Sequence, residues 1–182
     1  ISCAQGPQWE DLFNGKDLEG WEKLNGTAEY KVEEGSIVGI SQLSTPNTFL
    51  ATTGTYDDFI LEFEFKVDEG LTRECSSVAT ASRSIERAGF MVTQFEIDPS
   101  ERAWTGGMYD EVSRGRFYPL DYNREGQKAF LHGEWNKARV EAIGDHLRTW
   151  VNDIPCADLV DNTASSGFIA LQVPTATSWI SM

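Results

Sequence analysis

The sequence predicts an all-β fold, either a β-sandwich or a jelly roll, built from two antiparallel sheets. Short segments in which apolar and polar residues alternate recur along the chain with turn residues between them, which is typical of these folds. The clearest strand is predicted at residues 57–67. Its apolar side chains alternate with charged ones and therefore share one face: Phe59, Leu61, Phe63, Phe65 and Val67.

The remaining strands are predicted from the same alternation and from the turn residues beside them. Turns at 33–35, 143–145 and 152–153 join several of them into a hairpin and a meander. The strands are residues 30–32, 36–38, 94–98, 135–142, 147–151, 156–159 and 168–173. Residues 100–130, rich in Gly, Arg and aromatic side chains, are predicted to form a long irregular loop, and such loops in compact domains are usually functional.

Composition limits the functions that the chain can have. With 182 residues, of which 40% are apolar, the chain suits one folded domain with a full core. Its 15 Lys and Arg against 29 Asp and Glu give a net charge of −14, which argues against nucleic acid and anionic membranes as partners. No apolar run is long enough to span a membrane. The composition is compatible with a neutral, polyhydroxylated ligand, and equally with solubility alone.

The first residues resemble the end of an export signal. A small residue precedes a cysteine at Ser2-Cys3, as at a bacterial lipoprotein processing site, where the cysteine carries the lipid. We therefore expect residues 1–7 to be an export remnant or disordered, residues 8–182 to form a single β-sandwich domain, and Cys3 to be a lipid anchor. The expected location is the periplasm, the outer membrane as a lipoprotein, or the medium after secretion.

The cysteines and histidines do not predict a metal centre. Three Cys show no metal-ligand spacing, and an odd number gives no disulfide framework. His132 and His146 lie in different segments, so neither a zinc site nor a Ser-His-Asp triad is supported. The functional residues are therefore sought among the carboxylates, amides and aromatic side chains.

The strongest site candidate is the segment Gln94-Phe95-Glu96-Ile97-Asp98. Residues two apart on a strand lie on one face, so Gln94, Glu96 and Asp98 are predicted to project together. Neighbouring carboxylates repel each other, and a fold usually keeps such a pair for catalysis or binding. The alternative is a half-buried strand with its polar face in water.

Seven motifs that span nearly the whole chain resemble those of one known family. In chain order they are LFNGKDLEGW (12–21), VEEG (32–35), the strand 59–65, QFEID (94–98), GEWN (133–136), WVN (150–152) and SGFIALQ (166–172). They are similar to the 3-keto-disaccharide hydrolase domain family, long catalogued as a domain of unknown function. The resemblance implies a concanavalin A-like β-sandwich, usually exported by bacteria, that acts on carbohydrate.

The chain departs from the family pattern in two places. Between residues 72 and 93 the family carries a run similar to LNSGVQFRS and then HGYQ, and this chain has neither. Deletion of one nucleotide after the Leu71 codon converts a coding sequence for that run into one for LTRECSSV, the residues found here. We therefore predict a compensated pair of frame errors at residues 72–93, and a wrong or missing closing strand at residues 174–182. Cys75 and Arg83 are for this reason not site candidates.

The resemblance implies chemistry on a sugar that is oxidised at its 3-position. A carboxylate can remove the acidic proton beside the ketone, the enolate can expel the group at the anomeric carbon, and water can add back. Glu96 and Asp98 are the expected base and acid. The expected sugar-binding residues are Gln94, Glu64, Trp104, Tyr109, Asp110, Arg114 and Gln172. Such an oxygen-rich site would suit a hard divalent cation such as Ca²⁺, although no motif fixes one.

Two other functions remain open. Residues 96–101 have the E-x-D-x-x-E spacing of laminarinase-like β-glucanases, but Pro99 cannot donate to a ladder and is expected to end the strand before Glu101. A binding module without catalysis would use Arg114 or Arg116 to bond sugar hydroxyls and loop aromatics to stack on sugar rings. These aromatics are Trp104, Tyr109, Phe117 and Tyr118.

Overall fold

The computed structural model describes most of the chain. The described residues are 9–42, 44–67, 78–81, 93–110, 115–162 and 166–174, with only the backbone described for 78–81, 116 and 117. The predictions that concern Cys3 and Arg114 lie outside these residues. So do most of the predicted frame error at 72–93 and all but the first residue of the predicted C-terminal error.

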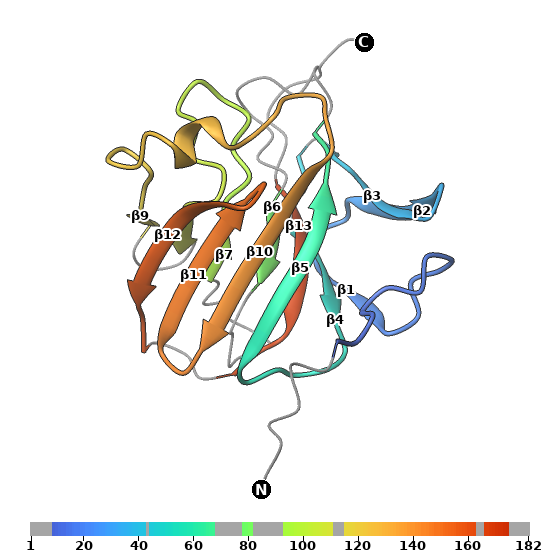
Figure 1. Ribbon diagram of the computed structural model, residues 1–182. Helices are drawn as coiled ribbons and strands as arrows, with labels where there is room; N and C mark the ends of the chain where they lie inside the picture. Colours follow the sequence, from blue (N-terminus) through green and yellow to red (C-terminus); the bar gives the residue numbers. More distant parts are fainter. Residues whose placement is uncertain are drawn as a thin grey trace, which may run out of the picture.

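One layer of the fold is a four-stranded antiparallel sheet, in front in Figure 1. Its order is β12 (Ile154–Val160), β11 (His146–Val151), β10 (Asn136–Ile143) and β5 (Phe59–Phe65). The predicted strand at 57–67 and the predicted meander are therefore confirmed. Asn152 and Asp153, with φ of 49° and 63°, make the tight turn from β11 to β12 that their residue types favour.

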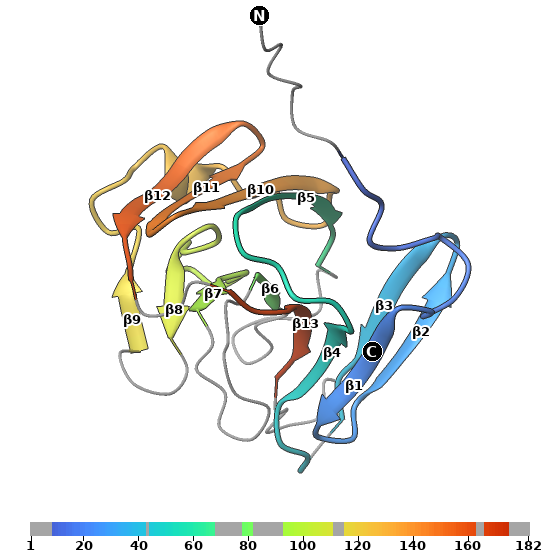
Figure 2. The ribbon, with the colours of Figure 1, turned by 90° about the horizontal axis from the view of Figure 1, so that it is seen from below.

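The second layer lies across the core from the first, as Figure 2 shows from below. One part has the order β1 (Trp21–Asn25), β4 (Thr48–Thr52), β13 (Ile169–Val173) and β6 (Val78–Ala81). The other part has the order β7 (Thr93–Phe95), β8 (Met108–Asp110) and β9 (Gly115–Tyr118), and β7 lies beside β6. The predicted hairpin is confirmed as β2 (Glu29–Glu33) and β3 (Ser36–Ile40), next to β4 and β1.

Aromatic and aliphatic side chains from both layers form the core between them. Phe95 of β7 is fully buried and meets the rings of Phe63 and Phe65 of β5 edge to face, with centroids 5.6 and 6.3 Å apart. Phe65 also stacks on Phe130 at 5.9 Å. Phe63 and Phe65 belong to the face that the alternation of residues 59–67 predicts, and Phe95 fixes which face of β7 is internal.

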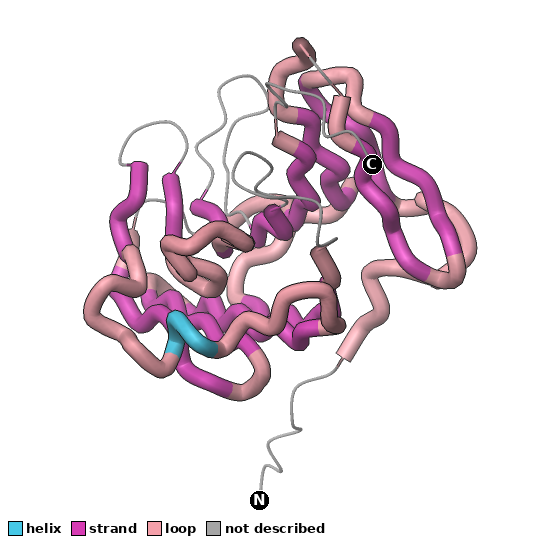
Figure 3. Tube along the Cα trace, turned by 90° about the horizontal axis from the view of Figure 1, so that it is seen from above, coloured by secondary structure: helices cyan, strands magenta, loops and turns pink. Residues whose placement is uncertain are grey.

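Two predictions about the middle of the chain are wrong. The strand expected at residues 94–98 already ends at Phe95. The segment 100–130, expected to be an irregular loop, contains β8 and β9. A short 3-10 helix at Gly126–Lys128 follows, drawn in cyan in Figure 3. No helix among the described residues is long and apolar enough to cross a membrane.

Asparagines in the motifs that carry the family resemblance form hydrogen bonds that stabilise turns of the backbone. Asn136 is fully buried, and its amide bonds both the N–H and the carbonyl of Leu131 at 2.8 Å, closing the turn around the GEWN motif. Asn152 of the WVN motif donates to the Asn136 side chain at 2.9 Å and accepts from the N–H of Lys137. In the first motif, the Asn14 side chain accepts from the N–H of Asp17. These asparagines therefore have structural roles.

Candidate functional site

Glu96 lies just beyond the end of β7, where the backbone is held on both sides. Its N–H donates to the carbonyl of Gly107 at 2.9 Å, and its carbonyl accepts from the N–H of Gly106 at 2.8 Å. Two further bonds close the loop that follows: Thr105 Oγ1 accepts from the N–H of Asp98 and donates to its carbonyl. The loop from Glu96 to Gly107 is therefore a closed hairpin, and Glu96 stands at its base.

A shallow, solvent-open pocket lies beside Glu96. It holds about 180 Å³ when its open mouth is counted, and its enclosed part has room for about one water molecule. Glu96 is half-buried in its wall, and three aromatic side chains, Trp104, Tyr109 and Tyr118, line the rest. Gly107, Met108 and Pro119 complete the lining. Among the described residues that line it, Glu96 is the single carboxylate. The pocket lining therefore combines one acid with three aromatic rings.

The sequence predictions are partly brought together here. Glu96, Trp104 and Tyr109, expected separately as a catalytic and two sugar-binding residues, line one pocket. Tyr118, expected only for a binding module, joins them. Tyr109 reaches the pocket because its strand, β8, pairs with both β7 and β9.

Asp98 does not share the pocket, so the prediction that Glu96 and Asp98 project together from one strand is wrong. Asp98 is 2% exposed, and its Oδ1 accepts from the N–H of Ser100 at 3.0 Å. Its Oδ2 lies 2.9 Å from Nε of Arg102. The cause of the difference is the Thr105 bridge, which turns the backbone at Asp98 out of the ladder, and Pro99 has no N–H with which to continue it.

Gln94 and Gln172 are buried, not open to a ligand. The Gln94 side chain donates from Nε2 to Oε1 of Gln172 at 2.5 Å, linking β7 to β13. Gln94 is 1% and Gln172 6% exposed, and Asp110 at the end of β8 is also buried. All three were expected to contact the sugar; in this structure they are buried, and Gln94 and Gln172 bond each other.

Glu64 lies on the opposite side of the molecule from the site. Phe63 and Phe65 point into the core from β5, so Glu64 points outward from the other layer, opposite Lys137 of β10. Its neighbour Glu62 is bound by Arg139, which holds the pKa of that carboxyl below its usual value. The expectation that Glu64 lines the same face as Gln94 is therefore wrong.

Two glycines that sequence reasoning missed shape the pocket. Gly106 has φ of 94°, and a Cβ there would lie 2.7 Å from Cβ and Sγ of Cys156. A Cβ on Gly107 would lie 2.9 Å from the carbonyl oxygen of Tyr118. The signal was present in the sequence as a Gly-Gly pair directly after Trp104-Thr105.

A metal centre is not apparent in the part of the chain that the structure describes. There, no three His, Cys, Asp or Glu side chains gather as ligands would. Asp98, the acid expected beside Glu96, faces Arg102 instead. No chemical step proposed for the protein is routed through a cation.

The two packed antiparallel sheets and their curved arrangement define the class of protein: a concanavalin A-like β-sandwich of the lectin and glucanase type. The sequence matches, over residues 8–181, the family described as the 3-keto-alpha-glucoside-1,2-lyase-like domain. The chain belongs to this family. None of the curated proteins matches the sequence.

Solved structures share the fold at low sequence identity. A glycosyl hydrolase candidate from Parabacteroides distasonis superimposes with a TM-score of 0.63 at 16% identity, covering 91% of this chain and 87% of that one. A lichenase, a β-1,3-1,4-glucanase from a mouse hindgut metagenome, gives 0.54 at 14% identity, covering 88% and 82%. The carbohydrate-binding module CBM66 from Bacillus subtilis gives 0.51 at 18% identity, covering 89% and 96%. At these identities the likeness concerns the fold alone.

Proposed function

We propose that the protein cleaves glycosides whose sugar is oxidised at the 3-position, with Glu96 as the base. The observation that carries the proposal is the pocket at the end of β7, whose lining combines one acid, Glu96, with Trp104, Tyr109 and Tyr118. The family, described by a 1,2-lyase-like activity on 3-keto-alpha-glucosides, supports the same chemistry.

One carboxylate is enough for the first step of this reaction. Glu96 removes the proton from carbon 2 of the sugar, which the neighbouring ketone makes acidic, and the electron pair forms an enolate. The enolate then expels the oxygen at carbon 1, which leaves with a proton from solvent, so that a double bond joins carbons 1 and 2. Water added to carbon 1, with a proton returned to carbon 2, completes a net hydrolysis.

The geometry favours this elimination over ordinary glycoside hydrolysis. Retaining and inverting hydrolases use two carboxyl groups that flank the bond, about 5–5.5 Å or about 6.5–9.5 Å apart. Here Asp98 is buried against Arg102, and Glu101 is exposed and is not part of the pocket lining. Neither is placed as a second carboxyl beside Glu96.

A saccharide-binding role without turnover is the second candidate, because three of the seven residues that line the pocket are aromatic. Aromatic faces give affinity for a sugar ring without any chemical step. The fold that the protein shares with the module CBM66 is compatible with this role. The two candidates differ in whether Glu96 changes a rate or only an affinity.

The test is aglycone release from nitrophenyl 3-keto-glucosides of both anomeric forms. We expect turnover by the wild type, a loss of about 10²–10⁴-fold in kcat for Glu96→Gln, and no loss for Glu101→Gln, an exposed acid of the same loop. Sugar affinity without release would favour the binding module. Cleavage of unoxidised β-glucan, with the keto-glucosides untouched, would favour a glucanase and contradict the proposal.

A further inference from the structure

Asp98 is a buried acid that the proposed reaction does not use. It lies two residues after Glu96, is 2% exposed, and has Arg102 as its ion-pair partner at 2.9 Å. Oδ2 makes no well-aligned hydrogen bond, so the contact with Arg102 is mainly electrostatic. An acid is costly to bury unless its charge is paired, and Arg102 supplies the pairing charge here.

Arg102 carries this restraint to the pocket. Its guanidinium carbon lies 5.1 Å from the ring centroid of Trp104, within the range of a cation–π interaction. The guanidinium end of the side chain is also restrained, because Nε donates to Oγ of Ser100 at 3.2 Å. Asp98 therefore sets the place of Arg102, and Arg102 lies over one face of the Trp104 indole.

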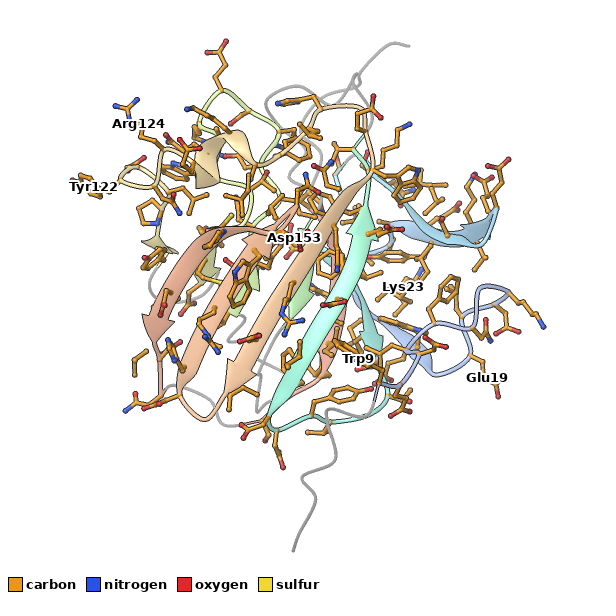
Figure 4. All side chains as sticks on the ribbon, viewed as in Figure 1. Trp9, Glu19, Lys23, Tyr122, Arg124 and Asp153 are labelled. Atoms are coloured by element: carbon orange, nitrogen blue, oxygen red, sulfur yellow. The ribbon has the colours of Figure 1, made fainter. Side chains whose placement is uncertain are left out.

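The edge of the same indole is held from a second segment. Nε1 of Trp104 donates to Oδ1 of Asp121 at 3.0 Å, which ties the hairpin loop to the segment after β9. Asn123 anchors that segment by donating to the carbonyls of Pro155 and Cys156 at 2.8 Å. On either side of Asn123, Tyr122 and Arg124 project outward from the molecule (Figure 4).

The backbone before the indole is also constrained. Ala103 has φ of 54°, a left-handed conformation that alanine rarely adopts, and its N–H donates to the carbonyl of Ser100. A strained residue persists where its surroundings determine the conformation. The loop therefore holds Trp104 in one orientation: Arg102 contacts one face of its indole, and Asp121 bonds its edge.

We infer that Asp98 is a positioning residue, which holds Trp104 in the wall of the Glu96 pocket through Arg102. This assignment rests on the proposed function only for its effect on turnover. The two acids then have different roles. Glu96 acts on the sugar, and Asp98 orients the Trp104 ring on which the sugar stacks. A positioning residue of this kind affects substrate affinity more than the chemical step.

The first test needs no substrate. The protein is labelled with 5-fluorotryptophan, and the Trp104 signal is assigned in the ¹⁹F spectrum by its loss in Trp104→Phe. We expect Asp98→Asn to move or broaden the Trp104 signal and to leave the signals of tryptophans in the other layer unchanged. Glu101→Gln, which alters an exposed charge in the same loop, should leave Trp104 unmoved. An unmoved Trp104 in Asp98→Asn would overturn the inference.

A second variant keeps the test valid if Asp98→Asn does not fold. Arg102→Lys retains the charge near Asp98 but lacks the planar guanidinium that lies over the indole. Arg102 is partly exposed, so this change does not bury a new unpaired charge. We expect Arg102→Lys to move the Trp104 signal as well, and an unmoved signal would contradict the role of Arg102.

The kinetic readout separates positioning from catalysis. With the nitrophenyl 3-keto-glucosides, we expect Asp98→Asn and Arg102→Lys to raise KM by about 3- to 30-fold, the range that a cation–π contact can supply, and to change kcat little. A fall in kcat as deep as that of Glu96→Gln, with KM unchanged, would make Asp98 a catalytic acid and overturn the inference. If the wild type shows no turnover, the proposed function fails, and the fluorine signals alone decide the positioning role.

Discussion

Thr149 and Gly106 join the two layers of the fold by a buried hydrogen bond directly behind the pocket. The hydroxyl of Thr149, on β11, donates to the carbonyl of Gly106 and accepts from the N–H of Ala157 on β12. Thr149 is fully buried and stands where the pairing of β11 with β12 shifts register. The register shift between β11 and β12 thus places the Thr149 hydroxyl where it bonds the hairpin loop between Glu96 and Gly107.

The Thr149 hydroxyl is expected to contribute measurably to stability. Thr149→Val keeps the shape of the side chain but leaves the Gly106 carbonyl and the Ala157 N–H without a partner, which should lower the free energy of unfolding by about 1–3 kcal/mol. Urea denaturation measures the change. Thr149→Ser retains the hydroxyl and should lose less, so a serine variant weaker than the valine variant would contradict this account.

Gly106 is expected to tolerate no side chain. Alanine there combines a left-handed backbone with a Cβ 2.7 Å from Cys156, whereas Gly35 has φ of 77° and nothing within 4 Å of its Cβ position. Gly35→Ala therefore measures the backbone cost alone. We expect Gly106→Ala to be less stable than Gly35→Ala by about 1–3 kcal/mol from overpacking. Equal losses in the two variants would show that the contact with Cys156 relaxes freely.

The thiol of Cys156 should make stability depend on alkaline pH. Burial raises the pKa of Cys156 from 9.0 to about 11. Between these values the unfolded chain loses the thiol proton while the folded chain keeps it, so the free energy of unfolding falls as the pH rises, by at most about 1.4 kcal/mol per pH unit. Below pH 9 this contribution is fully present.

Denaturation curves from pH 8 to pH 11 test the prediction when wild type is compared with Cys156→Ala. The difference between the two proteins should shrink as the pH rises. A constant difference would show that the thiol does not ionise more easily in the unfolded chain. Peptide mapping after iodoacetamide treatment at pH 8 gives a second check, because the buried thiol should react only after unfolding.

Glu64 should be dispensable for the proposed reaction. It lies on the outer face of the layer that does not carry the pocket, so Glu64→Gln should leave kcat/KM within about twofold of wild type, as expected of an exposed substitution away from a site. The assay is the same release of nitrophenol. A large loss would require the substrate to reach the outer face of β5.

Strand periodicity predicted most of the layer that contains β5, β10, β11 and β12. Charged residues alternate there with core residues because one face meets water. The residue types of Asn152 and Asp153 indicate where the tight turn lies. β4 was missed for the opposite reason: all five residues from Thr48 to Thr52 are buried, so no alternation remains to be seen. Burial on both faces removes the signal that periodicity reads.

The candidate site was predictable only in part. Glu96, Trp104 and Tyr109 were expected from residue type and from the family resemblance, and they meet at one pocket. Asp98 was misplaced because sequence spacing cannot show that Thr105, seven residues later, bonds both backbone groups of Asp98. Contacts between the loop and its base decide where a side chain points, and alternation describes only regular strands.

The backbone bonds between Glu96 and the two glycines have a consequence for how the pocket opens. We expect the bonded amide protons of Glu96 and the two glycines to exchange with heavy water as slowly as those of the neighbouring core strands. Since the hairpin is fastened to both layers, the pocket should persist until the sandwich itself comes apart. The surface proposed to bind the sugar is then formed by the folded scaffold itself.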